Sequence, residues 1–324
     1  MPKLIAVTIG DIKGIGIYLL LENWQTNKLK NFILFCNKDI IRRYIKKNKI
    51  KAKLNIINSN KSDINYKNNC LNVFTFLSKN NEDNTYKSLK FAHEFCINKK
   101  CIGLVTLPLR KDLIKKKIDK NFIGHTEFFQ NLENKSNSNM ILYHKEIIIS
   151  PLTTHISINK VSKKISNKKY LFNKIINLNN SLKFDFNFKK PKIIISGLNP
   201  HAGENGFIGK EELNYIIPII KKLKKKGISI EGPYSADSML IKKNLKKYDC
   251  FIFIYHDQAL IPFKFISQFS GINFTGNLSI IRTSPDHGTA YKLIGSKEIS
   301  NKSILNCFKL TREIYKNRLT NDQS

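Results

Sequence analysis

Residues Lys192–Gly227 read KIIISGLNPHAGENGFIGKEELNYIIPIIKKLKKKG. The apolar run Lys192–Ser196 is typical of a strand buried on both faces of a sheet. After a glycine-rich segment, Lys210–Lys226 has the spacing of a helix with one apolar face. That face is formed by Leu213, Ile216, Ile217, Ile220 and Leu223. Gly227 stands where a helix commonly ends in a left-handed residue. The stretch therefore predicts a strand, a loop and a helix in succession.

The same alternation recurs along the chain. Further apolar runs of strand type are Leu4–Thr8, Asn31–Cys36, Lys53–Ile57, Cys101–Thr106 and Cys250–Tyr255. Strands that alternate with helices indicate an α/β fold with a mainly parallel or mixed sheet. At 324 residues the chain is long enough for two domains or one large α/β unit. Asn55–Asn72 and Leu178–Lys190 are dominated by polar residues, and we expect both to be surface loops.

The chain is strongly basic, with 56 Lys and Arg against 24 Asp and Glu and a formal charge of +32. Such a charge is typical of nucleic-acid-binding proteins. Lys greatly outnumbers Arg, however, and Asn, Ile, Phe and Tyr are abundant too. These residues share AT-rich codons, so genomic base bias accounts for the whole set. We therefore do not expect a nucleic-acid partner, although the field can help to steer an anionic substrate.

Cysteines and the N-terminal sequence bear on the compartment. The six cysteines form no CxxC pair, and several lie in apolar runs, as reduced core cysteines do. The N-terminus enters a strand without the apolar region of a signal peptide. No apolar run approaches the ~20 residues of a membrane span. The expectation is a cytoplasmic protein that does not interact with membranes.

Five segments depart from the Lys- and Asn-rich composition of the chain. Each contains a histidine and lies beside a strand-type run. They are Gly124–Glu127, Thr153–His155, Gly197–Gly206, Tyr255–Gln258 and Thr283–Ala290. Ligands of open α/β sheets bind at the carboxyl ends of strands, so site residues are expected here. His155, His201 and His256 could together hold Zn²⁺ or a similar ion with one open position. Their separations fit no zinc-finger or HExxH pattern, and separate hydrogen-bonded loop histidines are the alternative.

Two glycine-bearing loops and two basic residues are further candidates for ligand binding. Gly197–Gly206 permits close approach of the backbone to a ligand. Gly10–Gly16 follows the first strand, but its glycine spacing is not GxGxxG and no acidic residue completes the motif. A Rossmann dinucleotide fold is therefore rejected, and the loop is either a simple turn or faces a ligand. Lys264 follows the apolar run Leu260–Phe263, and Arg282 ends the strand-like run Leu278–Ile281. A cation at the end of an apolar strand could hold a phosphate or carboxylate, with surface charge the alternative for Lys264.

Six motifs in this order closely resemble the 4-hydroxythreonine-4-phosphate dehydrogenase family of vitamin B6 biosynthesis. They are GHTEFF (124–129), TTHI (153–156), GLNPHAGENGFIG (197–209), GPYSADS (232–238), YHDQALIPFK (255–264) and RTSPDHGTAY (282–291). The resemblance implies a fold like that of isocitrate and isopropylmalate dehydrogenases, with two α/β/α domains around a cleft. The first domain is expected over 1–124 and 288–324. The second, over 125–287, is expected to carry the metal site and the dimer interface.

The resemblance also implies the site residues. Histidines matching His155, His201 and His256 bind one divalent metal per subunit (zinc, magnesium or cobalt), the last coming from the partner subunit of a homodimer. Positions that match His125, Thr126, Lys264, Asn273 and Arg282 bind substrate. Asp257 and Asp237 are candidates for proton transfer or for supporting the metal ligands. The resemblance assigns no cofactor-binding residue to this chain.

The implied reaction is the oxidation of 4-phosphooxy-L-threonine at C3 by NAD or NADP, followed by loss of CO₂ to give 3-amino-2-oxopropyl phosphate. Two places depart from the family pattern. The usual GDPAGIGPE loop reads GDIKGIGIY over Gly10–Tyr18, and Arg110 replaces a usual Asn or Ser. The metal and phosphate positions are intact, so we expect activity to be retained.

Two rival functions remain. A related dehydrogenase that acts on phosphothreonate or phosphoerythronate would carry the same motifs. A basic nucleic-acid-binding protein would need no metal and would bind in a salt-sensitive manner.

Overall fold

The structure is a computed structural model that describes residues 3–58, 64–145, 147–294 and 300–322. The chain divides into two compact units, which are described separately. Unit 1 comprises Met1–Phe128 and Ser279–Lys316, and unit 2 comprises Phe129–Leu278 and Asn317–Ser324. The sequence expectation placed the boundaries at 124/125 and 287/288. In the structure 125–128 and 279–287 belong to unit 1, and 317–322 belong to unit 2. The pairing of β12 (Arg282–Pro285) with β5 (Gly103–Thr106) places 279–287 in unit 1.

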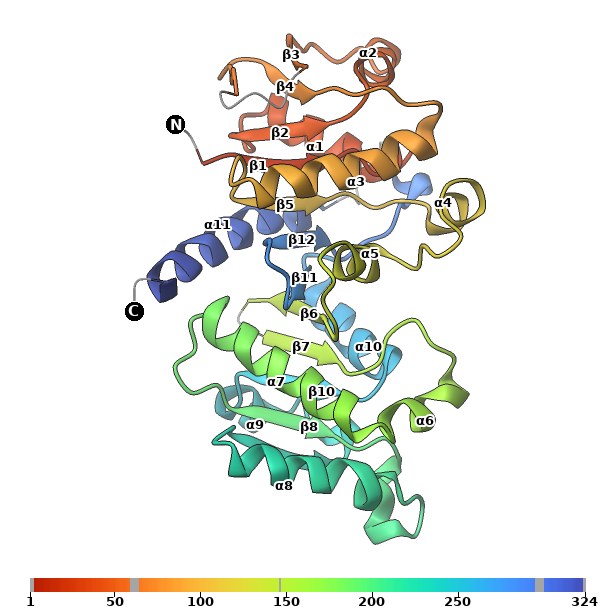
Figure 1. Cartoon of the computed structure of the whole chain (residues 1–324), viewed down its shortest axis with the longest axis vertical. Helices are drawn as coiled ribbons and strands as arrows, with labels where there is room; N and C mark the ends of the chain where they lie inside the picture. Colours follow the sequence, from red (N-terminus) through yellow and green to blue (C-terminus); the bar gives the residue numbers. More distant parts are fainter. Residues whose placement is uncertain (1–2, 59–63, 146, 295–299, 323–324) are drawn as a thin grey trace. The chain divides into compact units, whose positions relative to one another are not determined.

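Unit 1 is built on a parallel sheet (Figure 1). Its strands are β1 (Ile5–Thr8), β2 (Phe32–Phe35), β3 (Leu54–Ile57), β4 (Leu71–Phe74), β5 (Gly103–Thr106) and β12 (Arg282–Pro285). They lie in the order β3-β4-β2-β1-β5-β12. Most of these strands are buried along their whole length, as expected for a sheet that is covered on both faces.

Helices cover both faces of this sheet. They are α1 (Ile15–Gln25), α2 (Lys38–Lys47), α3 (Asn81–Ile97), α4 (Lys111–Lys117), α5 (His125–Leu132) and α11 (Lys302–Asp322), with a short 3₁₀ turn η5 (Tyr291–Leu293). Phe35 packs edge-on against Phe95 of α3, and Phe32 packs edge-on against Phe308 of α11. Side chains three positions apart on a strand point to opposite faces, so α3 and α11 lie on opposite sides of the sheet.

Unit 2 has a mixed sheet. Its strands are β6 (Asn139–His144), β7 (Ile147–Pro151), β8 (Ile193–Ser196), β9 (Ile230–Tyr234), β10 (Cys250–Phe253) and β11 (Ile272–Gly276). The order is β11-β6-β7-β10-β8-β9. β7, β10, β8 and β9 run parallel, whereas β6 is antiparallel to both of its neighbours.

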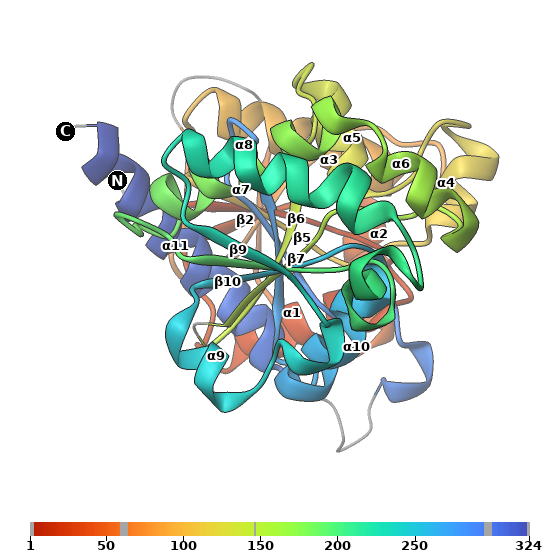
Figure 2. The same ribbon diagram turned by 90° about the horizontal axis from the view of Figure 1, so that it is seen from below.

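The helices of unit 2 are α6 (Val161–Ile165), α7 (Lys168–Phe184), α8 (Ile217–Lys225), α9 (Lys242–Lys247) and α10 (His256–Ser267). Figure 2 shows α7 and α8 on one side of the sheet and α9 and α10 on the other. Short turns complete the unit: η1 (Ile158–Lys160), η2 (Pro200–Gly206), η3 (Glu212–Ile216) and η4 (Ala236–Ser238). Helices on both faces of a largely parallel sheet confirm the predicted α/β class.

The predicted strand runs are confirmed, each within two residues at its ends. One detail is wrong: Leu278–Ile281 was taken as a strand that ends at Arg282, but strand β12 begins at Arg282. The predicted helix is present as η3 followed by α8, and Gly227 has the left-handed φ of +78°. Leu213 is exposed instead of buried, because η3 is a π-helical turn that changes the helical register and turns Glu212 inward.

Both predicted surface loops are wrong at one or both ends: residues 64–70 and 185–190 lie outside helices and strands, as predicted, and 59–63 lie outside the described residues, but the remaining parts belong mostly to strands or a helix. Asn55 and Asn72 are buried in the adjacent strands β3 and β4, where Asn55 Nδ2 donates to Asn72 Oδ1 at 2.8 Å. Leu178 and Leu182 are buried in α7, which continues to Phe184. The prediction was based on the many polar residues in both stretches. Amides that hydrogen-bond to one another can be buried at low cost, and a helix needs apolar residues only on its buried face.

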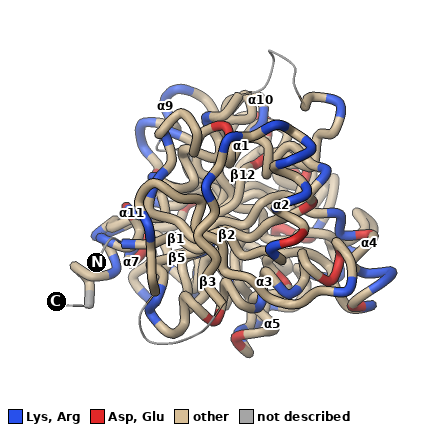
Figure 3. The backbone as a smooth tube through the Cα atoms, turned by 90° about the horizontal axis from the view of Figure 1, so that it is seen from above, with Lys and Arg blue, Asp and Glu red and all other residues tan. Residues whose placement is uncertain are grey.

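The remaining general expectations concern cysteines, charge and membranes. All six cysteines are free thiols, and five of them are buried. Figure 3 shows Lys and Arg distributed along many elements, α2, α4, α9, α10 and α11 among them, and not gathered over one. Within the described residues, no helix combines the length and apolar character needed to cross a membrane.

Candidate active site

Three histidines of unit 2 follow three neighbouring strands. His155 comes after β7, His256 after β10 and His201 after β8. β10 pairs in parallel with both β7 and β8, so the carboxyl ends of all three strands lie at the same edge of the sheet. This edge is where α/β proteins bind ligands. The topology thus brings together segments that are 46 and 55 residues apart in the sequence (201 − 155 and 256 − 201).

The structure brings two of these rings close together. The centroids of His155 and His256 are 5.9 Å apart, with their planes at 41°. His201 is exposed on the adjacent η2 segment. The described residues of this one chain contain no cluster of three or more His, Cys, Asp or Glu side chains with the geometry to hold a metal ion. Three imidazoles at one sheet edge are nevertheless the right kind of donor for zinc or cobalt.

The two candidate aspartates differ in their surroundings. Oδ1 of Asp257 lies 2.7 Å from Nδ1 of His256. A carboxylate in this position keeps the proton on Nδ1 and leaves Nε2 as the electron-pair donor, which is the usual arrangement behind a metal-bound imidazole. Asp237 is exposed in η4, which packs beside the η2 segment that carries His201.

Side chains tie the three histidine segments to one another. Thr153 Oγ1 donates to the carbonyl of Ile254 at 2.8 Å, which joins the His155 and His256 segments. Gln258 accepts from Ile254 N at 2.8 Å and donates through Nε2 to Gly197 O at 3.1 Å, which joins the His256 and His201 segments. Sequence reasoning did not assign roles to Thr153 or Gln258, although both lie in the quoted motifs.

The segment that carries His201 has an unusual backbone. Residues 201–205 all have left-handed φ values, from +43° to +79°, and only Gly203 among them is a glycine. For other residues this conformation costs on the order of 1–2 kcal/mol each. The surrounding structure must therefore hold the segment in place.

Unit 1 contains a group of cationic and polar side chains around Arg282. Arg282 is 1% exposed, and its Nε and Nη2 donate to Thr106 Oγ1 at 2.9 and 2.6 Å. Burial lowers its pKa to about 10. His125 opens α5, and its Nε2 is buried without a hydrogen-bond partner. Burial, with the positive charges of Arg282 and Lys111, holds the pKa of His125 well below its usual value. A neutral imidazole beside two cations suits an anionic ligand.

The remaining predicted substrate residues lie in different settings. Thr126 is buried next to His125 in α5. In unit 2, Asn273 lies on β11 with its Oδ1 buried and without a hydrogen-bond partner. Lys264 lies on α10, so it is on a helix and not at the end of a strand, and its Nζ is 5.5 Å from the ring centre of Phe269.

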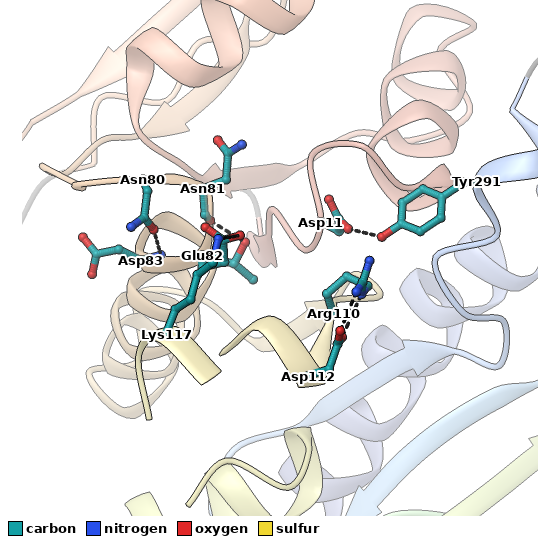
Figure 4. A network of polar contacts seen from close by, with 10 residues as sticks. Asp11, Asn80, Asn81, Glu82, Asp83, Arg110, Asp112, Lys117 and Tyr291 are labelled. Carbon is teal, nitrogen blue, oxygen red and sulfur yellow. Dashed lines mark hydrogen bonds and ion pairs between the residues drawn. The ribbon is translucent and has the colours of Figure 1, made fainter. Parts of the chain in front are cut away.

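Unit 1 also contains a pocket of about 330 Å³ that the sequence did not reveal. It is lined by residues 11–13 of the β1–α1 loop, by the start of α3, by Arg110, Leu113 and Ile114, and by Tyr291. Figure 4 shows Tyr291 donating to Asp11, and Arg110 paired with Asp112, its Nε 2.7 Å from Oδ1. Both places where the sequence departs from the family pattern, the Gly10–Tyr18 loop and Arg110, therefore contribute to this pocket.

The parallel strands, and the polar groups gathered where they end, define an α/β enzyme. Comparison with known proteins identifies the family. A model of the family described as "Pyridoxal phosphate biosynthetic protein PdxA" matches residues 28–311. The chain belongs to this family.

The similarity to known proteins extends over almost the full length of this chain. The chain is 38% identical over 320 residues to the 4-hydroxythreonine-4-phosphate dehydrogenase of Wigglesworthia glossinidia brevipalpis, covering 96% of each. It is 32% identical to that of Bacteroides thetaiotaomicron, covering 97% of this chain and 89% of the relative. The crystal structure of the Klebsiella pneumoniae dehydrogenase matches with a TM-score of 0.81 at 26% identity, over 97% of this chain and 99% of that one. The resemblance and the fold class are thereby confirmed.

Proposed function

We propose that this chain is a 4-hydroxythreonine-4-phosphate dehydrogenase that acts in pyridoxine 5′-phosphate biosynthesis in the cytoplasm. Its substrate would be 4-phosphooxy-L-threonine and its product 3-amino-2-oxopropyl phosphate, with NAD or NADP as the oxidant. The observation that carries the proposal is that His155 and His201 follow β7 and β8 at the same sheet edge in a member of this family, where they would share a metal ion with His256 of the partner subunit.

These three histidines are proposed to bind one divalent ion per subunit, with zinc, cobalt or magnesium as candidates. Imidazole donors favour zinc or cobalt over magnesium. When bound, the ion would supply Lewis-acid chemistry that makes the substrate hydroxyl more acidic and stabilises negative charge during loss of CO₂, and a nicotinamide would accept the hydride. Asp257 orients His256 for this task through its contact with Nδ1.

Substrate binding is proposed for residues of both units. In unit 1, Arg282 and the neutral His125 would bind an anionic group, with Thr126 beside them. In unit 2, Lys264 would supply a charge, and Asn273 would supply an amide whose buried Oδ1 has no hydrogen-bond partner among the described residues. Buried polar atoms without a partner are costly, so the structure favours a ligand that satisfies them.

The unit 1 pocket is proposed to hold the nicotinamide cofactor. It lies beyond the carboxyl ends of β1 and β5, and the first turn of α3 contributes Asn81 and Glu82 to its wall. Lys13 and Arg110 bring positive charge to a wall that also carries the carboxylates of Asp11 and Glu82. The volume suits one nucleoside portion of a dinucleotide. Three departures from the family pattern, Ile12, Lys13 and Arg110, line this pocket, and Arg110 is paired with Asp112.

A homodimer with the active site at the subunit interface completes the proposal, with His256 supplied to the metal site by the partner copy. Helix α10, which begins at His256, presents Ile261 and Phe265 to solvent, at 70% and 78% exposure. Phe269, just beyond the helix, is 53% exposed. Exposed apolar side chains grouped in this way are typical of an interaction surface.

The substrate is tested by comparing NADH formation from 4-phosphooxy-L-threonine and from 4-phosphothreonate, with phosphoerythronate as a third substrate. We expect the first to turn over fastest. Faster turnover of either acid phosphate would assign the chain to the related dehydrogenases. We also expect EDTA to abolish NADH formation and added zinc or cobalt to restore it; full activity in EDTA would refute the metal.

The rival nucleic-acid-binding function has less support, because the basic residues are dispersed along the chain (Figure 3). It predicts DNA or RNA binding that weakens steeply with salt and does not depend on a metal. We expect no such binding at physiological ionic strength.

A further inference from the structure

The Glu212 carboxylate is buried beneath the segment that carries His201. It is 1% exposed, in the π-helical turn η3. Its Oε1 accepts from the backbone N–H groups of Leu198 and Asn199 at 2.7 and 2.9 Å. Its Oε2 accepts from Asn199 Nδ2 at 3.0 Å. One carboxylate therefore satisfies three donors at the start of the glycine-rich segment.

Gly203, in the middle of the same segment, also packs closely against the Glu212 carboxylate. A Cβ on Gly203 would lie 2.5 Å from Glu212 Oε2 and 2.7 Å from the carbonyl oxygen of Gly209. With a φ of +79°, Gly203 also has a backbone conformation that suits glycine. The left-handed run 201–205 thus closes around Glu212, and His201 is its first residue.

The neighbouring Glu211 extends the arrangement to the His155 side. Its Oε2 accepts from Asn199 Nδ2 at 2.9 Å, and its Oε1 accepts from Ser162 Oγ at 2.8 Å. Ser162 lies in α6, which follows His155 by a short connection. These two hydrogen bonds lower the pKa of Glu211, so its carboxylate is ionised at neutral pH.

We propose that Glu212 is a positioning residue that holds His201 in its left-handed backbone conformation for metal binding, with Asn199 as the link to Glu211. Backbone hydrogen bonds also stabilise the run, since Ala202 N donates to Asn199 O at 3.1 Å and Ile208 N donates to Gly203 O at 3.2 Å; Asn199, which Glu212 binds, is therefore also an acceptor for the run. The inference rests on the proposed function, since it takes His201 to be a metal ligand. Glu212 itself contacts backbone and amide groups and is not expected to touch substrate or metal.

The first test is independent of the metal and of activity. In the metal-free full-length protein, hydrogen exchange of the amides of Leu198 and Asn199 is compared in the wild type, Glu212→Gln and Glu212→Ala. We expect exchange to accelerate at least tenfold in Glu212→Ala, and less in Glu212→Gln, because the amide oxygen still accepts. Unchanged protection in a folded Glu212→Ala variant would overturn the proposal.

The second test uses Co²⁺ alone as the probe, and measures its affinity and visible absorption spectrum in the same proteins. We expect Glu212→Ala to bind Co²⁺ at least tenfold more weakly with an altered spectrum, and Glu212→Gln to recover part of the affinity. Glu231→Gln is the matched control, since Glu231 of β9 also accepts hydrogen bonds, but from Tyr248 and Lys247. It should bind Co²⁺ like the wild type.

A third variant keeps the test decisive if Glu212→Ala does not fold. Asn199→Ala removes the Nδ2 donor to both glutamates and leaves both carboxylates in place. Weakened Co²⁺ binding in this variant supports the proposal, and wild-type affinity and spectrum in both Asn199→Ala and Glu212→Gln overturn it. If the wild type and His201→Ala bind Co²⁺ equally, the metal assignment fails, while the exchange experiment still reports whether Glu212 holds the segment.

Discussion

The side chain of Asp257 lies against the imidazole of the residue before it, with Oδ1 2.7 Å from Nδ1 of His256. The two residues occupy the first turn of α10, directly after the buried strand β10. A carboxylate accepts hydrogen bonds and does not donate them, so Nδ1 carries the proton. The free electron pair is then on Nε2, the atom available to a metal.

Replacement of Asp257 by Asn should therefore weaken metal binding without removing a ligand. An amide can still accept from Nδ1, but a neutral acceptor forms a weaker hydrogen bond than a carboxylate and orients the ring less firmly. We expect a 10- to 100-fold loss of zinc affinity, the usual range for such partners. Competition with a chelator measures it, and Asp39→Asn, an exposed carboxylate of unit 1, is the control. Equal affinity in Asp257→Asn and the wild type would contradict the role.

His201→Ala should abolish turnover and leave the fold intact. His201 is exposed, so its removal leaves no cavity and exposes no buried polar group. The circular dichroism spectrum and melting temperature should match those of the wild type, whereas NADH formation should fall below detection. Retained activity would remove His201 from the set of metal ligands.

Arg282→Lys should weaken substrate binding, because lysine keeps the charge but loses the planar fork of donors. A lost charge-assisted contact of about 2–3 kcal/mol corresponds to a roughly 30- to 150-fold lower kcat/KM, expressed mainly in KM. Arg42→Ala, whose side chain is 55% exposed on α2, serves as the control. An unchanged KM in Arg282→Lys would exclude Arg282 from binding the anion.

His125 should make stability depend on pH. Its pKa in the folded protein is well below 6.5, chiefly because of burial. Below pH ~6.5 His125 is protonated in the unfolded chain but stays neutral in the folded chain. The free energy of unfolding therefore falls by about 1.4 kcal/mol for each pH unit. Above that pH the contribution is fully present. His125→Gln should remove this dependence when unfolding in urea is measured at about pH 7.5 and about pH 5.5. Parallel losses in both proteins would argue against it.

Phe265→Asp should dissociate the proposed dimer. Phe265 is 78% exposed on α10, and a charge there cannot be buried against a second copy without a partner. We expect sedimentation to show a monomer, and activity to fall because the partner's histidine is lost. Leu77→Asp is the matched control, since Leu77 of unit 1 is 88% exposed. A Phe265→Asp protein that stays dimeric would place the interface elsewhere.

The sequence determined the local elements and the family. Six short runs rich in Ile, Val, Leu and Phe correctly predicted strands, and the six motifs identified the family across most of the chain. Where local polarity and tertiary burial conflict, the prediction failed. Asn55 and Asn72 satisfy one another inside the sheet, and Leu213 is turned outward by a π-helical turn.

Tertiary structure alone decided which distant residues meet. The order of β7, β10 and β8 places His155, His256 and His201 at one sheet edge, and strand order depends on packing over the whole unit. The role of Glu212 could not be read from the sequence, because it depends on an inward-facing carboxylate meeting backbone N–H groups 13 and 14 residues earlier. Hydrogen bonds between remote segments exist only once the chain has folded, so no local pattern encodes them.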